Sequence, residues 1–206
     1  MNTLLRSLPS FFAYTLLAIG AQNAIFTRGL GLSQGLRMIN DPKKDTVLFC
    51  TSLTVFQLLN SLMAYFVLPL INKSPFAQYS RFATPVVIVI CCVITYVVVI
   101  LFLSVAVKRS TFKRVIFSLT SASINSAIVG TIILSNSQGF TLLETIGFAL
   151  GSSIGYLLAI LLVDEGERKI KHELVPESFR GLPVTLIYIA VLALAVYGLT
   201  GHSIAL

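Results

Sequence analysis

Two long apolar stretches of this chain are interrupted near their middle by residues that form hydrogen bonds or end a helix. They are Asn23, Gly31 and Ser33 in the first stretch, and Asn125, Ser126 and Gly130 in the second. Polar groups at membrane depth are costly unless protein surrounds them, so such interruptions usually mark functional sites. The amides and hydroxyls can bond the backbone carbonyls that a broken helix leaves free, and this structural role suffices to explain them. The alternative is that they line a narrow path for electrons, ions or a small polar solute.

The composition is that of a polytopic membrane protein. Hydrophobic residues make up 56% of the 206 residues, charged residues make up 11%, and the mean hydropathy is +0.90. We expect an all-α protein with six transmembrane helices, each with the ~20 residues that a bilayer-spanning helix requires. The expected spans are about 8–27, 46–71, 83–107, 114–135, 139–163 and 182–204. They leave no room for a soluble domain, so residues 1–206 are expected to form a single integral membrane domain.

The two interruptions fall in the first and fourth expected spans, at corresponding places in the two halves of the chain. Short or glycine-interrupted segments in corresponding positions are typical of inverted-repeat membrane proteins. The sequence therefore predicts two inverted three-helix repeats, residues 1–107 and 108–206, in which helices 1 and 4 are broken.

Basic residues are concentrated in alternate loops. Of the 15 Lys and Arg residues, four lie in each of the loops after the first, third and fifth spans, and only Arg6, Lys73 and Arg81 lie on the other side. This bias places the basic loops in the cytoplasm and both termini outside. The formal net charge of +7 therefore reflects orientation in a lipid membrane, and we expect no nucleic-acid partner. The mixed-charge run 164–173 is expected to extend the fifth span as a helix into the cytoplasm.

Small and polar residues in other spans indicate helix packing. Gly147, Gly151 and Gly155 recur at a spacing that lets another helix approach closely. Gln57 and Ser61 share one face of the second span, where they can form hydrogen bonds to a neighbouring helix.

Residues that commonly bind metals or carry protons are few. Cys50, Cys91 and Cys92 lie in unbroken apolar spans, where packing is their expected role. No spacing of Cys and His indicates a metal site. Glu144, near the outer boundary of the fifth span, is expected to be hydrated at the membrane interface. Because no Asp or Glu lies near the middle of any expected span, autonomous ion-coupled pumping by this chain is disfavoured.

Three short motifs, taken with the order of the expected spans, resemble one known family. The most specific is the turn Val-Pro-Glu-Ser-Phe-Arg-Gly at 175–181, with Leu186-Ile187 after it. The other two are Asn23 with Leu30-Gly31-Leu32, and Asn125 with Ala127-Ile128-Val129-Gly130. Together they resemble the RnfA/NqrE family, the small membrane subunits of Rnf and Nqr complexes.

The resemblance implies a multi-pass subunit, in the inner (cytoplasmic) membrane of a bacterial cell, of a complex that couples electron transfer to ion translocation. The implied partners are a homologous RnfE/NqrD-like subunit of opposite orientation, or a second copy of this chain, and flavin-carrying subunits. No catalytic residues are recognisable in the chain itself, so any redox chemistry is expected to belong to those partners.

The resemblance also implies a cysteine in each broken helix. Together with two cysteines of the partner subunit, these would hold a [2Fe-2S] cluster near the middle of the membrane. The corresponding residues here are Ser33 and Ser126, and the implied site is completed by Asn23, Gly31, Asn125 and Gly130. A hydroxyl is a much weaker acid than a thiol and a poorer ligand for iron. We therefore expect the scaffold to be kept, the cluster to be lost and no other cofactor to be bound.

Two other functions fit six spans in a chain of this length. One is a small-solute transporter, or the substrate-binding membrane component of a vitamin uptake system. The other is a structural assembly subunit with no transport of its own. Flavin-carrying subunits among the neighbouring gene products would favour electron transport, and ATP-binding energising subunits would favour solute uptake.

Overall fold

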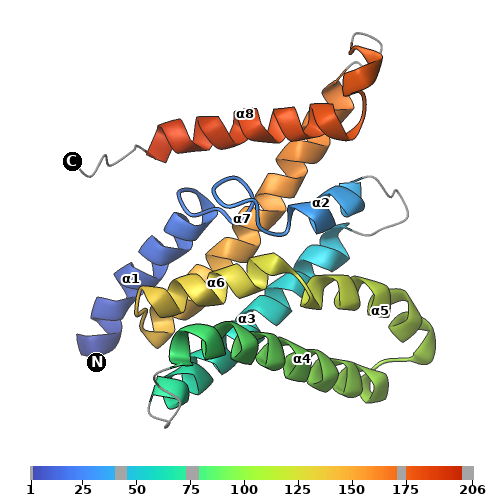
Figure 1. Cartoon of the computed structure of the whole chain (residues 1–206). Coiled ribbons are helices and arrows are strands. Elements are labelled where there is room, and N and C mark those ends of the chain that lie inside the picture. Colours follow the sequence, from blue (N-terminus) through green and yellow to red (C-terminus); the bar gives the residue numbers. More distant parts are fainter. Residues whose placement is uncertain (1, 40–45, 73–78, 171–174, 201–206) are drawn as a thin grey trace.

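The computed structural model describes residues 2–39, 46–72, 79–170 and 175–200, which are drawn as coloured ribbons in Figure 1. Every regular element within these ranges is helical, so the all-α prediction is confirmed. In chain order the elements are α1 (Asn2–Ile19), α2 (Leu32–Ile39), α3 (Thr46–Asn72), α4 (Ser80–Ala106), α5 (Arg109–Ser123), α6 (Ser126–Ser137), α7 (Leu142–Lys169), the short 3-10 turn η3 (Glu177–Phe179) and α8 (Leu182–Thr200).

Four of the described helices, α3, α4, α7 and α8, are long and apolar enough to cross a membrane. The pair α5 and α6 provides a fifth candidate span, bent by 41° at the break between them. In the first expected span the apolar helix covers only Leu8–Ile19, because the chain leaves the helix after Ile19. The described residues thus provide four or five candidates for the six expected spans, and the expected break in the fourth span is confirmed.

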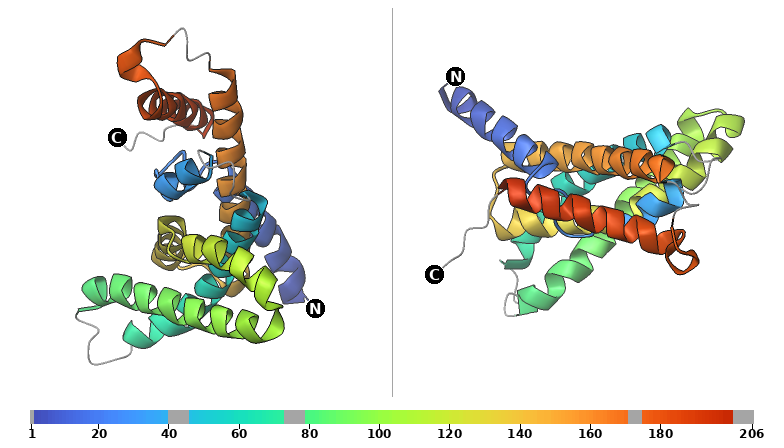
Figure 2. Two further views of the ribbon diagram at one scale, coloured as in Figure 1. Left: turned by 90° about the vertical axis from the view of Figure 1, so that its right-hand side faces the viewer. Right: turned by 90° about the horizontal axis from the view of Figure 1, so that it is seen from above.

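The long helix α7 forms the centre of the structure. α1 and α3 pack against α7, and α4, α5 and α6 pack against α3. The apolar window of α7 is 61% buried, whereas that of α8 is 11% buried. Figure 2 shows α4 and α8 at opposite ends of the helical array. Both present large exposed apolar side chains, such as Phe102 on α4 and Leu194 on α8, as expected of surfaces that face lipid or another subunit.

The glycine stripe of α7 is the surface on which α1 packs, which confirms the predicted close approach of a second helix. A Cβ atom at Gly151 would overlap the backbone of Thr15. A Cβ atom at Gly155 would lie 3.0 Å from the Cα atom of Ile19. Because the contacts advance in the same direction along both helices, α1 and α7 run parallel.

Glu144, the carboxylate expected at the membrane interface, caps the first turn of α7. Its Oε2 atom accepts a hydrogen bond at 2.9 Å from the backbone N–H of Thr141, which directly precedes the helix. An acidic residue in the first turn also interacts favourably with the helix dipole. A structural role therefore explains this carboxylate.

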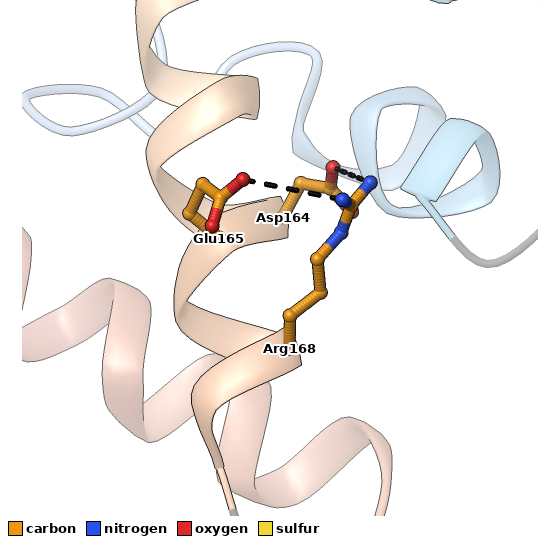
Figure 3. A network of polar contacts seen from close by, with 3 residues as sticks. All are labelled: Asp164, Glu165 and Arg168. Atoms are coloured by element: carbon orange, nitrogen blue, oxygen red, sulfur yellow. Dashed lines mark hydrogen bonds and ion pairs between the residues drawn. The ribbon is translucent and has the colours of Figure 1, made fainter.

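At its other end, α7 continues into the mixed-charge run as far as Lys169, which confirms the expected helical extension of the fifth span. Residues 171–173 of that run lie outside the described residues. Figure 3 shows the charged side chains of this end, where Arg168 lies 2.8 Å from Asp164 and 4.0 Å from Glu165. The Arg168 side chain is 67% exposed, so these pairs contribute little to stability.

Candidate functional site

The first break follows α1, where residues 20–31 leave the helix before α2 begins at Leu32. The buried side chain of Asn23 bonds backbone groups at the end of α1 and within this break, and one carbonyl of α7. Its Nδ2 donates to the carbonyl oxygens of Ile19, at 3.0 Å, and Gly155, at 2.9 Å. Its Oδ1 accepts from the N–H groups of Ile25, at 3.0 Å, and Phe26, at 3.2 Å. These bonds use the full capacity of a primary amide, so the predicted structural role of Asn23 is confirmed.

The first break also requires glycine at two positions. Gly29 has φ +65° and Gly31 has φ +73°, a left-handed conformation that other L-residues rarely adopt. At Gly31 the surroundings exclude a side chain as well, because a Cβ atom would lie 2.5 Å from Oδ1 of Asn125 and 2.6 Å from Cε2 of Tyr156. Around Gly29 there is open space. Gly31 therefore permits both a turn and a close contact with the second broken helix.

The second break separates α5 from α6 at Ile124 and Asn125. The Oδ1 atom of Asn125 accepts a hydrogen bond from the N–H of Ala127 at 2.9 Å, so this residue is the N-cap of α6. The Nδ2 atom of Asn125 donates to the hydroxyl of Tyr156 at 3.2 Å. The amide therefore starts one helix and contacts another, and it does not bond the freed carbonyls that the sequence analysis expected.

The two breaks contact each other directly. The N–H of Gly31 donates to Oγ of Ser126 at 2.8 Å, and Nε2 of Gln34 donates to the carbonyl oxygen of Ile124 at 2.6 Å. Residues about a hundred positions apart in the chain thus form one site at the centre of the structure. Figure 1 shows the irregular segment between α1 and α2 beside the junction of α5 and α6.

The remaining residues predicted for the site lie at or beside this contact. A Cβ atom at Gly130 would overlap the side chain of Leu30, so Gly130 allows the first break to pack against α6. Ser33 lies on α2, two residues beyond Gly31, and its side chain is exposed. Ser126 is also exposed, although its hydroxyl accepts the bond from Gly31.

Tyr156 of α7 is the main residue of the site that the sequence analysis missed. Its ring is fully buried, and its hydroxyl donates to the carbonyl oxygen of Gly31 at 2.8 Å while accepting from Asn125. The Tyr156 side chain therefore connects both breaks to α7 through hydrogen bonds. The signal in the sequence was a tyrosine directly after Gly155, because a phenol in an apolar span needs a polar partner.

A cavity of about 480 Å³ lies beside the second break. The segment 123–126 and Val129 line one side of it, and α4 lines the other with Cys92 and apolar neighbours. The structure thus brings Cys92 to the cavity that Ser126 also lines, a proximity that the sequence analysis did not predict. Cys50 and Cys91 lie in the packed interior, at 5% and 2% exposure, as their predicted packing role requires.

The donor groups at this site do not match the ligands of an iron–sulfur cluster. Iron–sulfur clusters are held by cysteine thiolates, with histidine in a minority of cases. Here Ser33 and Ser126 present hydroxyls, and one of these hydroxyls already accepts a backbone hydrogen bond.

The family described as "Rnf-Nqr subunit, membrane protein" has a model that matches residues 11–203. The chain is 35% identical over 77 residues to a subunit of the ion-translocating oxidoreductase complex of Syntrophotalea carbinolica. It is also similar to a subunit of the Na(+)-translocating NADH-quinone reductase, at 34% identity over 82 residues for Shewanella denitrificans and 32% over 83 residues for Chlamydia trachomatis serovar L2. These alignments cover 37–40% of this chain and 40%, 41% and 34% of the three relatives, respectively, so the chain matches about two fifths of each relative or less. Because the family model spans nearly the whole sequence, the chain belongs to the Rnf-Nqr family of membrane subunits.

Proposed function

We propose that this chain is a membrane subunit of an Rnf/Nqr-type complex that couples electron transfer to ion translocation in the bacterial cytoplasmic membrane. Family membership supports the assignment, and so do the relatives, which are named as subunits of ion-translocating complexes. The observation that carries the proposal furthest is the contact between Gly31 and Ser126. A protein that needed only membrane anchoring has no reason to break two helices and join the two breaks to each other.

The proposed arrangement is two inverted repeats, with six spans and both termini outside. Each half contributes one broken element, α1–α2 or α5–α6, to the shared contact, as expected if the halves are related by an axis in the membrane plane. The distribution of Lys and Arg supports the orientation.

The proposed partner is a homologous subunit of opposite orientation or a second copy of this chain, together with flavin-carrying subunits. The exposure of Ser33 and Ser126 supports a partner here, since a site completed by another subunit must face outward from this one. The exposed apolar faces of α4 and α8 provide further surface for association.

The subunit is proposed to work without a [2Fe-2S] cluster of its own. This follows from the two hydroxyls at the positions where the family resemblance implies thiolates. Electrons would then be carried by cofactors of the other subunits. A [2Fe-2S] EPR signal assigned to this subunit and its partner in the purified complex would contradict this part of the proposal.

The assembly is tested by purifying the tagged chain from its native membrane and identifying the co-purifying proteins by mass spectrometry. We expect flavin-carrying electron-transfer subunits, and electron-donor oxidation that depends on this chain. Recovery of an ATP-binding energising subunit without flavoproteins would contradict the proposal and support solute uptake. The double variant Ser33→Cys/Ser126→Cys tests the inherited geometry separately: an increased iron content, measured against the parent complex, supports it.

A further inference from the structure

A second cavity lies at the end of α6 that is remote from the break. It has a volume of about 410 Å³ and is lined by the C-terminal parts of α3 and α6, the turn after α6 and the first turn of α7. Its polar lining is contributed by Ser61 and Tyr65 of α3, Ser135 and Asn136 of α6 and Thr145 of α7. Because α1 and α7 run parallel, this is the end of the molecule at which α1 begins, as Figure 1 also shows.

Ser61, which lines this cavity, and two residues of α3 within one helical turn of it carry polar atoms that lack a hydrogen-bond partner among the residues that the structure describes. They are Oε1 of Gln57, both amide atoms of Asn60, and Oγ of Ser61. Gln57 and Asn60 are 0% exposed and Ser61 is 2% exposed. Buried polar groups are almost always hydrogen-bonded, and leaving them unpaired is strongly unfavourable. These side chains therefore require partners that the described residues do not provide.

The same side chains connect the cavity with the interior of the helical array. Gln57 donates through Nε2 to Oγ1 of Thr131 at 2.7 Å, and the Thr131 hydroxyl lies 3.0 Å from Oγ of Ser152. Ser61 lies one helical turn from Gln57 and lines the cavity. A series of polar side chains thus extends from the cavity to the place where α3, α6 and α7 meet.

We infer that this cavity is a water-filled chamber, open on the side of the membrane where α1 begins, whose inner water molecules hydrogen-bond Gln57, Asn60 and Ser61. Water fits the chemistry because it both donates and accepts. The unpaired atoms are two amide oxygens that accept, one amide nitrogen that donates and one hydroxyl that can do both. The volume is many times the ~30 Å³ that one water molecule occupies in the liquid. The described residues that line the cavity include no carboxylate to balance a bare cation, which favours neutral water. The inference is independent of the proposed electron-transport function, because it depends only on this cavity and its lining.

Matched cysteine substitutions test the chamber. Ser61→Cys and Ser153→Cys exchange serines that are equally buried, at 2% exposure, but only Ser61 lines the cavity. Gln138→Cys, at an exposed position after α6, reports which face of a vesicle corresponds to the open side. All three are made in the full chain, in its native membrane, on a background in which the native cysteines are replaced by alanine. The probe is a charged, membrane-impermeant methanethiosulfonate reagent.

We expect Ser61→Cys to react roughly tenfold faster or more than Ser153→Cys, because a hydrated thiol ionises more readily than a dry one. We also expect it to react only in vesicles whose sidedness exposes Gln138→Cys. Equal rates for the two serine positions, or labelling of Ser61→Cys from the opposite face, would overturn the inference.

A second measurement uses the unmodified protein, so its result does not depend on whether the cysteine variants fold. In a high-resolution cryo-EM map of the purified complex, we expect water density within hydrogen-bond distance of the Asn60 amide. If the map instead shows a protein group bonded to that amide, or apolar side chains packed around it without water, the chamber does not exist.

Discussion

The contact between the two breaks can be tested by placing one methyl group at each of two similar glycines. Gly29 and Gly31 lie two residues apart with nearly equal positive φ values, +65° and +73°. Alanine at either position incurs the cost of a left-handed conformation, about 1–2 kcal/mol, partly offset by reduced freedom of the unfolded chain. Only at Gly31 does the added methyl group also collide with Asn125 and Tyr156.

The collision would weaken two hydrogen bonds of Gly31. In one, its N–H donates to Ser126, and in the other its carbonyl oxygen accepts from Tyr156. At about 0.5–1.5 kcal/mol for each bond, the expected loss is about 1 kcal/mol for Gly29→Ala and about 2–4 kcal/mol for Gly31→Ala. The difference between the variants isolates the contact, because the backbone strain is common to both.

The measurement is the free energy of unfolding of the purified chain in mixed detergent micelles, titrated with a denaturing detergent and followed by circular dichroism. Gly198→Ala is the baseline, since Gly198 has open space around it, and it should change the free energy little. Equal losses for Gly29→Ala and Gly31→Ala would refute the reasoning, since they would mean that the second broken helix does not press on Gly31.

Three further predictions use the same unfolding assay. Tyr156→Phe removes only the hydroxyl that joins the two breaks, so we expect a loss of about 1–3 kcal/mol, and a loss below the experimental error would contradict that bridge. Asn23→Ala removes an amide with four hydrogen bonds, so we expect it to lower the free energy of unfolding by about 2–5 kcal/mol, more than Tyr156→Phe does. A smaller effect than that of Tyr156→Phe would show that water replaces the amide. Gly151→Ala should separate α1 from α7 because the new methyl group overlaps the Thr15 backbone, with an expected cost of about 1–3 kcal/mol. If the Gly151→Ala variant is as stable as Gly198→Ala, α1 does not pack against Gly151.

The sequence predicted those features of the fold that are set by local chemistry. Apolar composition and length predicted the helices, and the amides and small residues within 21–33 and 121–130 predicted their interruptions. The stripe Gly147, Gly151 and Gly155 predicted a close helix contact because the spacing places all three on one face. The pattern could not name α1 as the partner, since any helix with a smooth face satisfies the same spacing.

The first expected span was predicted too long for its helix. The apolar residues continue to Phe26, but Asn23 and the turns around it take the backbone out of the helix after Ile19. Apolar character alone does not reveal this, because buried residues of an irregular segment are as apolar as those of a helix. Ala24, Ile25 and Phe26 are all buried in the core without belonging to α1.

The polar contacts that join distant segments at the site could not be predicted from a single sequence. Gln34 reaches the carbonyl oxygen of Ile124 across 90 positions, and Tyr156 reaches Gly31 across 125. Each residue by itself is an ordinary polar side chain in an apolar stretch. The predicted hydrogen-bonding face of α3 is confirmed at one of its two residues. Gln57 bonds Thr131 on another helix, whereas Ser61 lines a cavity.

The two serines of the site differ in what they do for the fold. Ser126 accepts the N–H of Gly31 at 2.8 Å, a bond that a larger and weakly accepting sulfur atom would form less well. Its hydroxyl is therefore a structural connection between the two halves of the chain, at a position where the family resemblance implies a cluster ligand. Ser33 lies two residues away on α2 with its side chain exposed, toward whatever covers this face. In the proposed cluster-free subunit, this one hydroxyl would join the two breaks directly, so the paired breaks would not require iron between them.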